Sequence, residues 1–312
     1  MLKAPFPWFG GKSRAAGIIW TRLGDVGNYV EPFAGSLAVL LNRPTTPGNE
    51  IVNDLDCYVA NAWRAVKFAP EQVSEHCDWP VNEADLHARH RWLHGRTEFR
   101  QRMEHDPDFY DVRIAGFWIW GLSCWIGDNF CRPNRNNSVP HLTGGQGEED
   151  KIDVSRKIPY LDAGGRGAHK QSANLLEWFN ALAHRLRFTK VCCGDWARVL
   201  TKASTYGQGL TGVLLDPPYD AGDSHDDVYG DMSRGVSGKV REWALANGDN
   251  PLLRIAICGY DDEHDMPAAW DCVKWKASGG YASAAGNGEN SARERIWFSP
   301  HCLKDNQIEM FK

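Results

Sequence analysis

The chain has 312 residues, of which 42% are hydrophobic and 24% charged, a balance typical of folded globular proteins rather than disordered ones. Its first residues contain no apolar segment of the kind found in signal peptides. Its most apolar run, residues 114–126, is shorter than the roughly 20 residues that a membrane-spanning helix needs. The nine cysteines include no CxxC pair, which argues against a structural zinc site and favours reduced thiols in a cytoplasmic protein.

Charge is distributed unevenly along the chain. The net charge of −5 does not by itself indicate a nucleic-acid-binding protein. Between Asp85 and Lys190, however, 16 Lys and Arg residues stand against 13 Asp and Glu residues, and seven of the 11 histidines lie there as well. This segment would suit an anionic partner, although a solvated surface of mixed charge would have the same composition.

Hydrophobic periodicity predicts how strands and helices alternate along the chain. Apolar runs bounded by turn-forming residues predict strands, and apolar residues three, four or seven positions apart predict helices. Strands are expected at residues 28–31, 50–54, 189–193, 212–215, 252–258 and 293–298. Helices are expected at residues 37–42, 175–186, 196–202 and 236–246. A separate region at 58–126 is expected to be mostly helical, and it should end in a buried tryptophan-rich helix at 114–126. This alternation indicates a parallel α/β sheet, whose ligands lie beyond the carboxyl ends of the strands.

The most specific motif is Asp216-Pro217-Pro218-Tyr219, which directly follows an expected strand. Two consecutive prolines donate no backbone hydrogen bonds and stiffen the chain, so the segment should leave its strand as a rigid loop. The carboxylate of Asp216 and the carbonyl of Pro217 could accept both N–H hydrogens of an aromatic amine, which makes this poor nucleophile more reactive toward a methyl donor. Tyr219 could stack on a base swung out of a duplex.

A second group of residues suits a nucleotide-like ligand. The segment from Glu31 through Pro32, Phe33 and Gly35 forms a tight turn after a strand, where the glycine lets a ligand approach the backbone. Asp54 follows the next strand, about 20 residues further on, where an acid accepts hydrogen bonds from ribose hydroxyls in nucleotide-binding α/β folds.

Two further segments suit the same kind of site. The sequence Gly10-Gly11-Lys12-Ser13 is not a P-loop, because Phe6 occupies the position where a P-loop needs glycine. Lys12 could instead pair with a carboxylate, and Trp8 offers a flat surface beside a cofactor. After the strand at 189–193, Asp195 could accept an adenine amine with Trp196 packed alongside, or the two could be a charged helix cap and a core tryptophan.

In this order along the chain, the motifs resemble those of the Dam-type DNA adenine methyltransferases. The resemblance implies an α/β fold with a Rossmann-like class I methyltransferase sheet and a mostly helical target-recognition insertion. It places the catalytic, S-adenosylmethionine-binding domain at residues 1–60 and 175–312, and the insertion at 61–174. It further implies S-adenosylmethionine as the methyl donor, without a metal, and double-stranded DNA as the substrate. The implied cofactor residues are Trp8, Lys12, Pro32, Phe33, Gly35, Asp54, Asp195, Trp196 and Asp216, and the implied catalytic residues are Asp216, Pro217, Pro218 and Tyr219.

The insertion contains the residues expected to contact DNA. Residues 127–167 lack periodicity and are rich in Gly, Pro, Asn and charge, and a loop of this length is usually functional or disordered. Arg and Asn form bidentate contacts with guanine and adenine edges, whereas other cations contact phosphates. The residues expected to read bases are Arg132, Asn134 and Arg135, and those expected to contact phosphates are Arg166 and Lys170.

Two other functions are compatible with the residues. Related motifs with two prolines and an aromatic residue serve several planar nitrogen substrates, so an RNA or protein amine methyltransferase is the first alternative. The N-terminal Trp-Phe-Gly-Gly-Lys motif and the insertion favour DNA adenine over these substrates. The second alternative is a nucleic-acid-binding protein with an inactive methyltransferase fold, against which the intact Asp216 argues. Cytosine-C5 methylation is not expected, because the sequence has no Pro-Cys dipeptide.

Overall fold

The computed structural model describes the chain in several stretches that form two compact units. The described residues are 2–8, 10–45, 48–125, 130–131, 167–219, 235–275 and 290–304, without the side chains of 170–173, 290 and 291. The first unit, here called the sheet unit, comprises residues 10–55 and 188–312 together with Met1. The second, here called the helical unit, comprises residues 2–9 and 56–187. Each unit is described by itself below.

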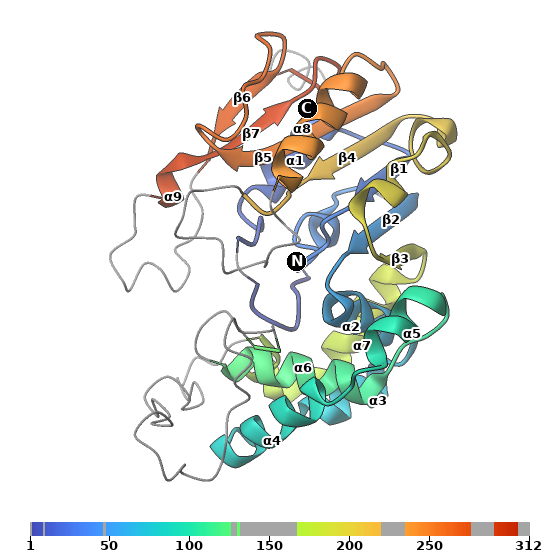
Figure 1. Ribbon diagram of the computed structural model, residues 1–312, viewed down its shortest axis with the longest axis vertical. Coiled ribbons are helices and arrows are strands. Elements are labelled where there is room, and N and C mark those ends of the chain that lie inside the picture. Colours follow the sequence, from blue (N-terminus) through green and yellow to red (C-terminus); the bar gives the residue numbers. More distant parts are fainter. Residues whose placement is uncertain are drawn as a thin grey trace. The chain divides into compact units, whose positions relative to one another are not determined.

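The sheet unit is built on a seven-stranded sheet with the order β3-β2-β1-β4-β5-β7-β6 (Figure 1). Its strands are β1 (Asn28–Glu31), β2 (Asn49–Asp54), β3 (Thr189–Cys193), β4 (Thr211–Leu215), β5 (Leu253–Tyr260), β6 (Asp271–Lys274) and β7 (Glu294–Phe298). The five strands from β3 to β5 run parallel, and β7 pairs antiparallel with both β5 and β6. The strand order changes direction between β1 and β4, and such a switch point is where open α/β sheets bind ligands.

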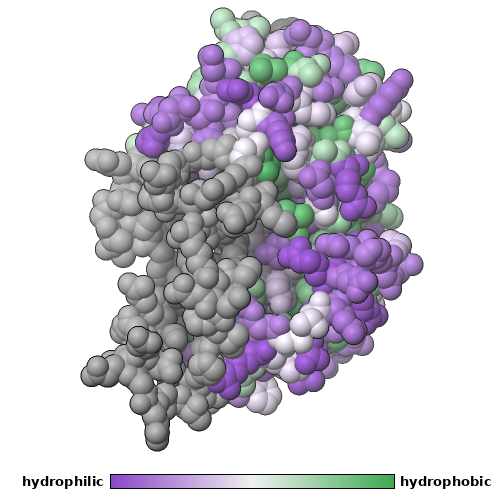
Figure 2. Space-filling view, in the orientation of Figure 1, coloured by the Kyte–Doolittle hydropathy of each residue, from purple (hydrophilic) through white to green (hydrophobic). Residues whose placement is uncertain are grey.

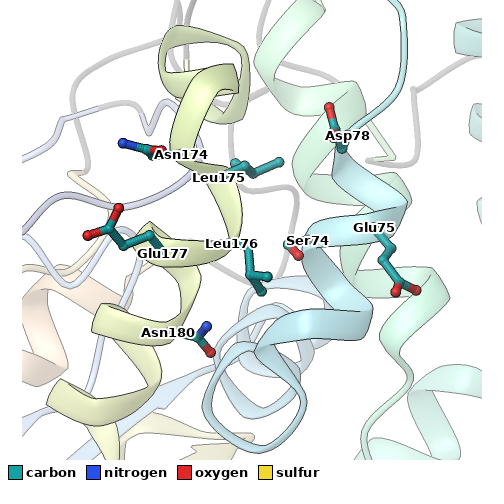
Figure 3. A pocket seen from close by; sticks show the side chains of 8 residues that line it. All are labelled: Ser74, Glu75, Asp78, Asn174, Leu175, Leu176, Glu177 and Asn180. Atoms are coloured by element: carbon teal, nitrogen blue, oxygen red, sulfur yellow. The ribbon is translucent and has the colours of Figure 1, made fainter.

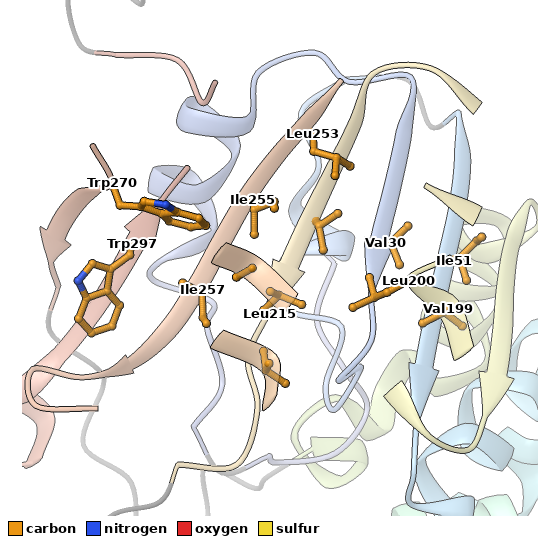
Figure 4. Packing of buried hydrophobic residues seen from close by; sticks show 13 residues of the cluster. Val30, Ile51, Val199, Leu200, Leu215, Leu253, Ile255, Ile257, Trp270 and Trp297 are labelled. Carbon is orange, nitrogen blue, oxygen red and sulfur yellow. The ribbon is translucent and has the colours of Figure 1, made fainter. Parts of the chain in front are cut away.

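The central strands are apolar because both of their faces are covered. Every residue of β1 and β4 is buried, as parallel strands require when helices pack on both sides. In register, Val30 of β1 lies beside Ile51 of β2 and Val213 of β4. These residues belong to one hydrophobic cluster with Leu215 and Ile257 (Figure 4). Helices α1 (Ala16–Leu23) and α8 (Val236–Asn247) both pack against β5.

The helical unit is organised around one apolar helix, α6 (Val112–Cys124). Its other helices are α2 (Cys57–Phe68), α3 (Pro70–Cys77), α4 (Glu83–His94), α5 (Phe99–His105) and α7 (Leu175–Leu186), with the 3-10 helix η4 (Gly167–Asn174). Helix α6 contacts α2, α3, α4 and η4. Gly116 allows the close approach of α3, because a Cβ at this position would lie 2.2 Å from Cβ of His76. The buried tryptophan-rich helix expected at 114–126 is confirmed, with Trp118 and Trp120 in its core.

Arginine side chains stacked on aromatic rings stabilise the contact between α4 and α6. The Arg89 guanidinium lies 4.2 Å from the ring centroids of both Phe117 and Trp120, and it donates a hydrogen bond to the His76 carbonyl at 3.2 Å. Burial lowers the pKa of Arg89, so the ring faces and the carbonyl compensate for lost hydration of a charged group. The outer surface of this helix pair also has Arg113, 4.6 Å from the Trp92 ring.

Several elements differ from the sequence-based expectations for local reasons. The helix expected at 37–42 is reduced to the 3-10 helix η1 (Leu40–Asn42), because Leu37 takes a left-handed conformation with φ 52° that an α-helix excludes. The helix expected at 196–202 is replaced by two 3-10 helices, η5 (Trp196–Val199) and η6 (Lys202–Ser204). The expectations for 28–31, 175–186 and 189–193 agree with β1, α7 and β3 to the residue.

The division into units also differs from the expected boundaries at 60/61 and 174/175. Helices α2 and α7 lie wholly in the helical unit, because α2 packs on α6 and α7 packs on α3. The boundaries therefore fall at the carboxyl end of β2 and just before β3. No helix in the described part of the chain is long and apolar enough to cross a membrane. On the face drawn in Figure 2, hydrophobic residues form small patches between hydrophilic ones.

Candidate active site

The carboxyl ends of β1, β2, β3 and β4 lie along one edge of the sheet, because these strands are parallel neighbours. The Asn53 side chain connects three of the loops that begin there. Its Nδ2 donates to the carbonyls of Pro32, at 3.1 Å, and Gly194, at 2.9 Å. The Gly194 N–H in turn donates to the Asp54 carbonyl at 3.0 Å. Asn53 therefore connects the loops of the site, although it is not among the site residues expected from the sequence. The only sequence feature that could have indicated this role is an amide side chain at the end of an apolar strand.

Asp54 fixes the turn that follows β1. Its Oδ2 accepts a hydrogen bond from the Gly35 N–H at 2.9 Å, and Gly35 has a left-handed conformation with φ 44°. A side chain at Gly35 would strain this backbone, which explains why glycine stands here. The expected pair of an acid and a glycine turn on adjacent strands is thus brought together by a direct hydrogen bond.

Two half-buried aromatic residues lie beside this turn. The rings of Phe33 and Trp196 are stacked, with centroids 6.2 Å apart and an interplanar angle of 25°, and both pack against the edge of the sheet core. Asp195 is exposed, and its Oδ1 accepts a hydrogen bond from the Ala197 N–H at 2.9 Å as the N-cap of η5. The structure therefore gives Asp195 a capping role and provides a flat apolar surface through Phe33 and Trp196.

A buried ion pair follows β4. Nζ of Lys12 lies 2.9 Å from Oδ1 of Asp216 and also donates to the Gly10 carbonyl at 3.1 Å. Lys12 is only 4% exposed. Burial by itself would lower the pKa of Lys12, but the charges of Asp216 and Glu294 outweigh it and raise that pKa above its usual value. Lys12 therefore stays protonated and supplies a fixed positive charge beside Asp216.

Tyr219 joins this ion pair to a second carboxylate. Its hydroxyl lies 3.1 Å from Oε2 of Glu294 and 3.3 Å from Oδ1 of Asp216. Its ring packs edge-on against Tyr260, with centroids 4.8 Å apart. Burial, followed by the nearby carboxylates, raises the pKa of Tyr219 well above its usual value, so the phenol is a hydrogen-bond donor. Pro217 between the two side chains is buried and keeps the backbone of the loop rigid.

The remaining residues expected in the site fall into two groups. Trp8 is in the helical unit, where its ring lies 6.0 Å from Phe6 and 6.3 Å from Trp118. The expected DNA-contacting residues Arg132, Asn134, Arg135 and Arg166 lie outside the described residues, as does the side chain of Lys170. Within the described residues there is no group of three or more His, Cys, Asp or Glu side chains that could hold a metal ion.

A hollow in the helical unit is unsuited to an anionic ligand. It lies between α3 and α7, has a volume of about 610 Å³ and is seen in Figure 3. Its lining residues are Ser74, Glu75, Asp78, Asn174, Leu175, Leu176, Glu177 and Asn180. Three of these are acidic and none is basic, so the hollow does not compete with the strand ends as a site for a nucleotide-like ligand or DNA.

The sheet and the residues at its edge define a mixed α/β enzyme with a fold compatible with the methyltransferases. Residues 8–126 match the family model described as D12 class N6 adenine-specific DNA methyltransferase. A comparison with curated proteins gives no match. The chain is thus a DNA adenine-N6 methyltransferase that uses S-adenosylmethionine, as the resemblance to Dam-type enzymes predicted. The matched segment contains Lys12, Gly35 and Asp54, whereas Asp216 and Tyr219 lie beyond its end.

Proposed function

We propose that the sheet unit is a Rossmann-like class I methyltransferase domain and that the helical unit recognises double-stranded DNA. The strand order, with β7 inserted antiparallel between β5 and β6, supports the first part. The local excess of cations between Asp85 and Lys190 supports the second, since 15 of its 16 Lys and Arg residues lie in the helical unit, together with its 13 Asp and Glu residues. The bases would be read by Arg132, Asn134 and Arg135, and phosphates would be contacted by Arg166 and Lys170.

The residues at the edge of the sheet fit S-adenosylmethionine by their chemistry. Asp54 would accept hydrogen bonds from the ribose hydroxyls, and Gly35 would let the cofactor approach the backbone beside it. The stacked rings of Phe33 and Trp196 offer an apolar surface to the adenine. Asn53 supports this fit, because its buried Oδ1 has no hydrogen-bond partner in the described structure. Further proposed contacts come from Trp8, Lys12, Pro32, Asp195 and Asp216.

Asp216 and Tyr219 would position the target adenine for the reaction. The cofactor supplies an electrophilic methyl group when bound. The Asp216 carboxylate and the Pro217 carbonyl accept the two N6–H hydrogens, which favours a pyramidal nitrogen with a localised lone pair. The bond from N6 to the methyl carbon would form as the bond from that carbon to the sulfur of the donor breaks. The positive charge that develops on the nitrogen would be stabilised by these two acceptors until one of the two N6 protons is released to water. The Tyr219 ring stacks on the extruded base.

The observation that carries this proposal is the buried Lys12–Asp216 ion pair at the end of β4, next to Tyr219. We expect Asp216→Ala to abolish methyl transfer to DNA, because it removes an acceptor from the reacting amine. Tyr219→Ala should be nearly as damaging, and Tyr219→Phe much less so, since stacking needs the ring rather than the hydroxyl. Transfer of a radiolabelled methyl group to DNA measures these rates, and circular dichroism with thermal unfolding shows whether the variants are folded. Near-normal turnover of Asp216→Ala would contradict the proposed site.

A further inference from the structure

Glu294 is a buried acid next to the proposed catalytic residues, but it belongs to no motif identified in the sequence. It is the first residue of β7, where it pairs with Tyr260 of β5. Its side chain is 8% exposed. A carboxylate this deeply buried is costly unless charge or hydrogen bonds compensate for lost hydration, so its partners indicate its purpose.

The partners of Glu294 are the same two groups that bind Asp216. Tyr219 lies with its hydroxyl 3.1 Å from Glu294 and 3.3 Å from Asp216. Lys12 lies with Nζ 3.9 Å from Glu294 and 2.9 Å from Asp216. The Lys12 ammonium therefore lies between the two carboxylates, and the Tyr219 phenol, which has one hydrogen, donates it to Glu294 or to Asp216. The four groups form a closed set of contacts.

This set of contacts has a consequence for the two oxygens of Asp216. Lys12 and Tyr219 both contact Oδ1 of Asp216, and Oδ2 makes no hydrogen bond or ion pair with the described residues. Glu294 holds these two donors on the side of Oδ1, because both also contact Oε2 of Glu294. Without Glu294, Lys12 would be free to bind Asp216 through both oxygens, and the Tyr219 ring would lose one of its two polar anchors.

We propose that Glu294 is a positioning residue for methyl transfer: it holds Lys12 and Tyr219 so that one oxygen of Asp216 stays available to the adenine amine. This inference rests on the proposed role of Asp216. Burial raises the pKa of Glu294, and the like charge of Asp216 adds to that effect while Lys12 opposes it. Protonation of Glu294 therefore weakens its attraction for Lys12, so the rate of methyl transfer should depend on the protonation of Glu294. The titratable groups that face this cluster are Lys12, Glu31, Asp216, Tyr219, Cys258 and Tyr260.

The test compares Glu294→Ala and Glu294→Gln with the wild-type enzyme. The matched control is Glu242→Gln, which changes an exposed acid on α8 of the same unit. Three quantities are measured: the single-turnover rate of methyl transfer to DNA, the dissociation constant of S-adenosylmethionine, and the pH dependence of the rate.

We expect Glu294→Ala to lower the single-turnover rate by ten- to a hundredfold and to change the cofactor dissociation constant by less than threefold. Glu294→Gln keeps an acceptor for Tyr219 but loses the charge that holds Lys12, so its rate should be intermediate. Glu294→Gln lacks the carboxyl group whose pKa is raised, so its rate of methyl transfer should persist to lower pH than that of the wild type. The control should match the wild type in all three measurements.

Two outcomes would overturn the inference. One is a wild-type rate with an unchanged pH profile in Glu294→Gln. The other is an equal loss of rate and of cofactor affinity in both variants with an unchanged pH profile, which would assign Glu294 a merely structural role. The Asp216→Ala variant distinguishes failure of this inference from failure of the proposed site. If Asp216→Ala is inactive and Glu294→Gln is unaffected, only the inference about Glu294 is rejected. If Asp216→Ala is active, the proposed site itself is rejected.

Discussion

Replacing Lys12 by methionine tests whether the buried ion pair organises the site. Methionine keeps most of the length and the apolar stem of lysine but removes its charge. In Lys12→Met, the carboxylates of Asp216 and Glu294 would face each other with only the Tyr219 hydroxyl between them. We expect a lower free energy of unfolding and a loss of methyl transfer, because the buried Glu294 and the partly exposed Asp216 would lose their shared counter-ion.

The size of the effect follows from the distances and the burial. At 2.9 Å and an effective dielectric constant of 20, the attraction between Lys12 and Asp216 is about 6 kcal/mol before desolvation is subtracted. Removing one partner of a fully buried pair typically costs about 3–5 kcal/mol. Because the Asp216 side chain is 22% exposed and water can relieve part of its charge, we expect a cost of about 2–3 kcal/mol for Lys12→Met.

The loss of stability caused by Lys12→Met should depend on pH. Burial raises the pKa of Glu294, and the positive charge of Lys12 partly opposes this increase. Without Lys12, the folded-state pKa of Glu294 rises further above its unfolded value of about 4.3. A raised carboxyl pKa favours the folded state below the unfolded pKa, and this advantage disappears as the pH rises through the folded pKa. The variant should therefore lose little stability at acidic pH and most at neutral and alkaline pH.

Urea unfolding followed by circular dichroism at about pH 5 and about pH 8 measures this difference. The control is Lys239→Met, which removes an exposed lysine from α8. Adding Asp216→Asn to Lys12→Met should restore part of the lost stability, because it removes one of the two opposing charges, but it should not restore methyl transfer. An equal loss of stability at both pH values, with no recovery in the double variant, would refute this account of the ion pair.

Two further predictions concern the packing of the helices and the contact with DNA. Gly116→Ala should lower the free energy of unfolding by about 1–3 kcal/mol, because its Cβ would collide with α3. The control is Gly17→Ala in α1, where a Cβ meets no atom within 4 Å. This variant should be neutral or stabilising by up to about 1 kcal/mol. Thermal unfolding compares the two, and equal effects would contradict the close approach of α3 to α6. Arg166→Ala should lower the slope of the logarithm of DNA affinity against the logarithm of salt concentration by about one, as expected for one lost phosphate contact. Binding titrations at several salt concentrations measure the slope, and an unchanged slope would remove Arg166 from the DNA-contacting residues.

Much of the fold could be predicted from the sequence, because most of its elements are marked by local patterns. The apolar run of β4 and the periodic pattern of α7 reflect burial on both faces and on one face, respectively. Strand β6 (Asp271–Lys274) was not predicted, since it lies at the edge of the sheet and three of its four residues are exposed. Helix α1 was not predicted either, although five of its eight residues are buried.

The candidate site could be predicted only where its residues are adjacent in sequence. The turn at Gly35 and the loop at Asp216 are short motifs that directly follow strands. Glu294 and Asn53 were missed because their roles depend on contacts across the sheet. Glu294 reaches a tyrosine 75 positions earlier in the chain, and Asn53 reaches Gly194, 141 positions later. A sequence pattern does not reveal contacts at such separations, since they exist only once the strands have assembled.

The hydrogen bonds of Asn53 connect three strand ends. Its side-chain amide donates to the carbonyls of Pro32 and Gly194, while its backbone carbonyl accepts from the Ala34 N–H at 2.8 Å. A fluctuation that opens the turn after β1 must therefore break contacts made by β2, and through Gly194 it also loosens the loop after β3. We therefore expect local opening of this edge to be a shared event, in which the amide hydrogens of Ala34 and Gly194 exchange with solvent at correlated rates. A ligand that orders one of these three segments should therefore protect the amide hydrogens of the other two as well.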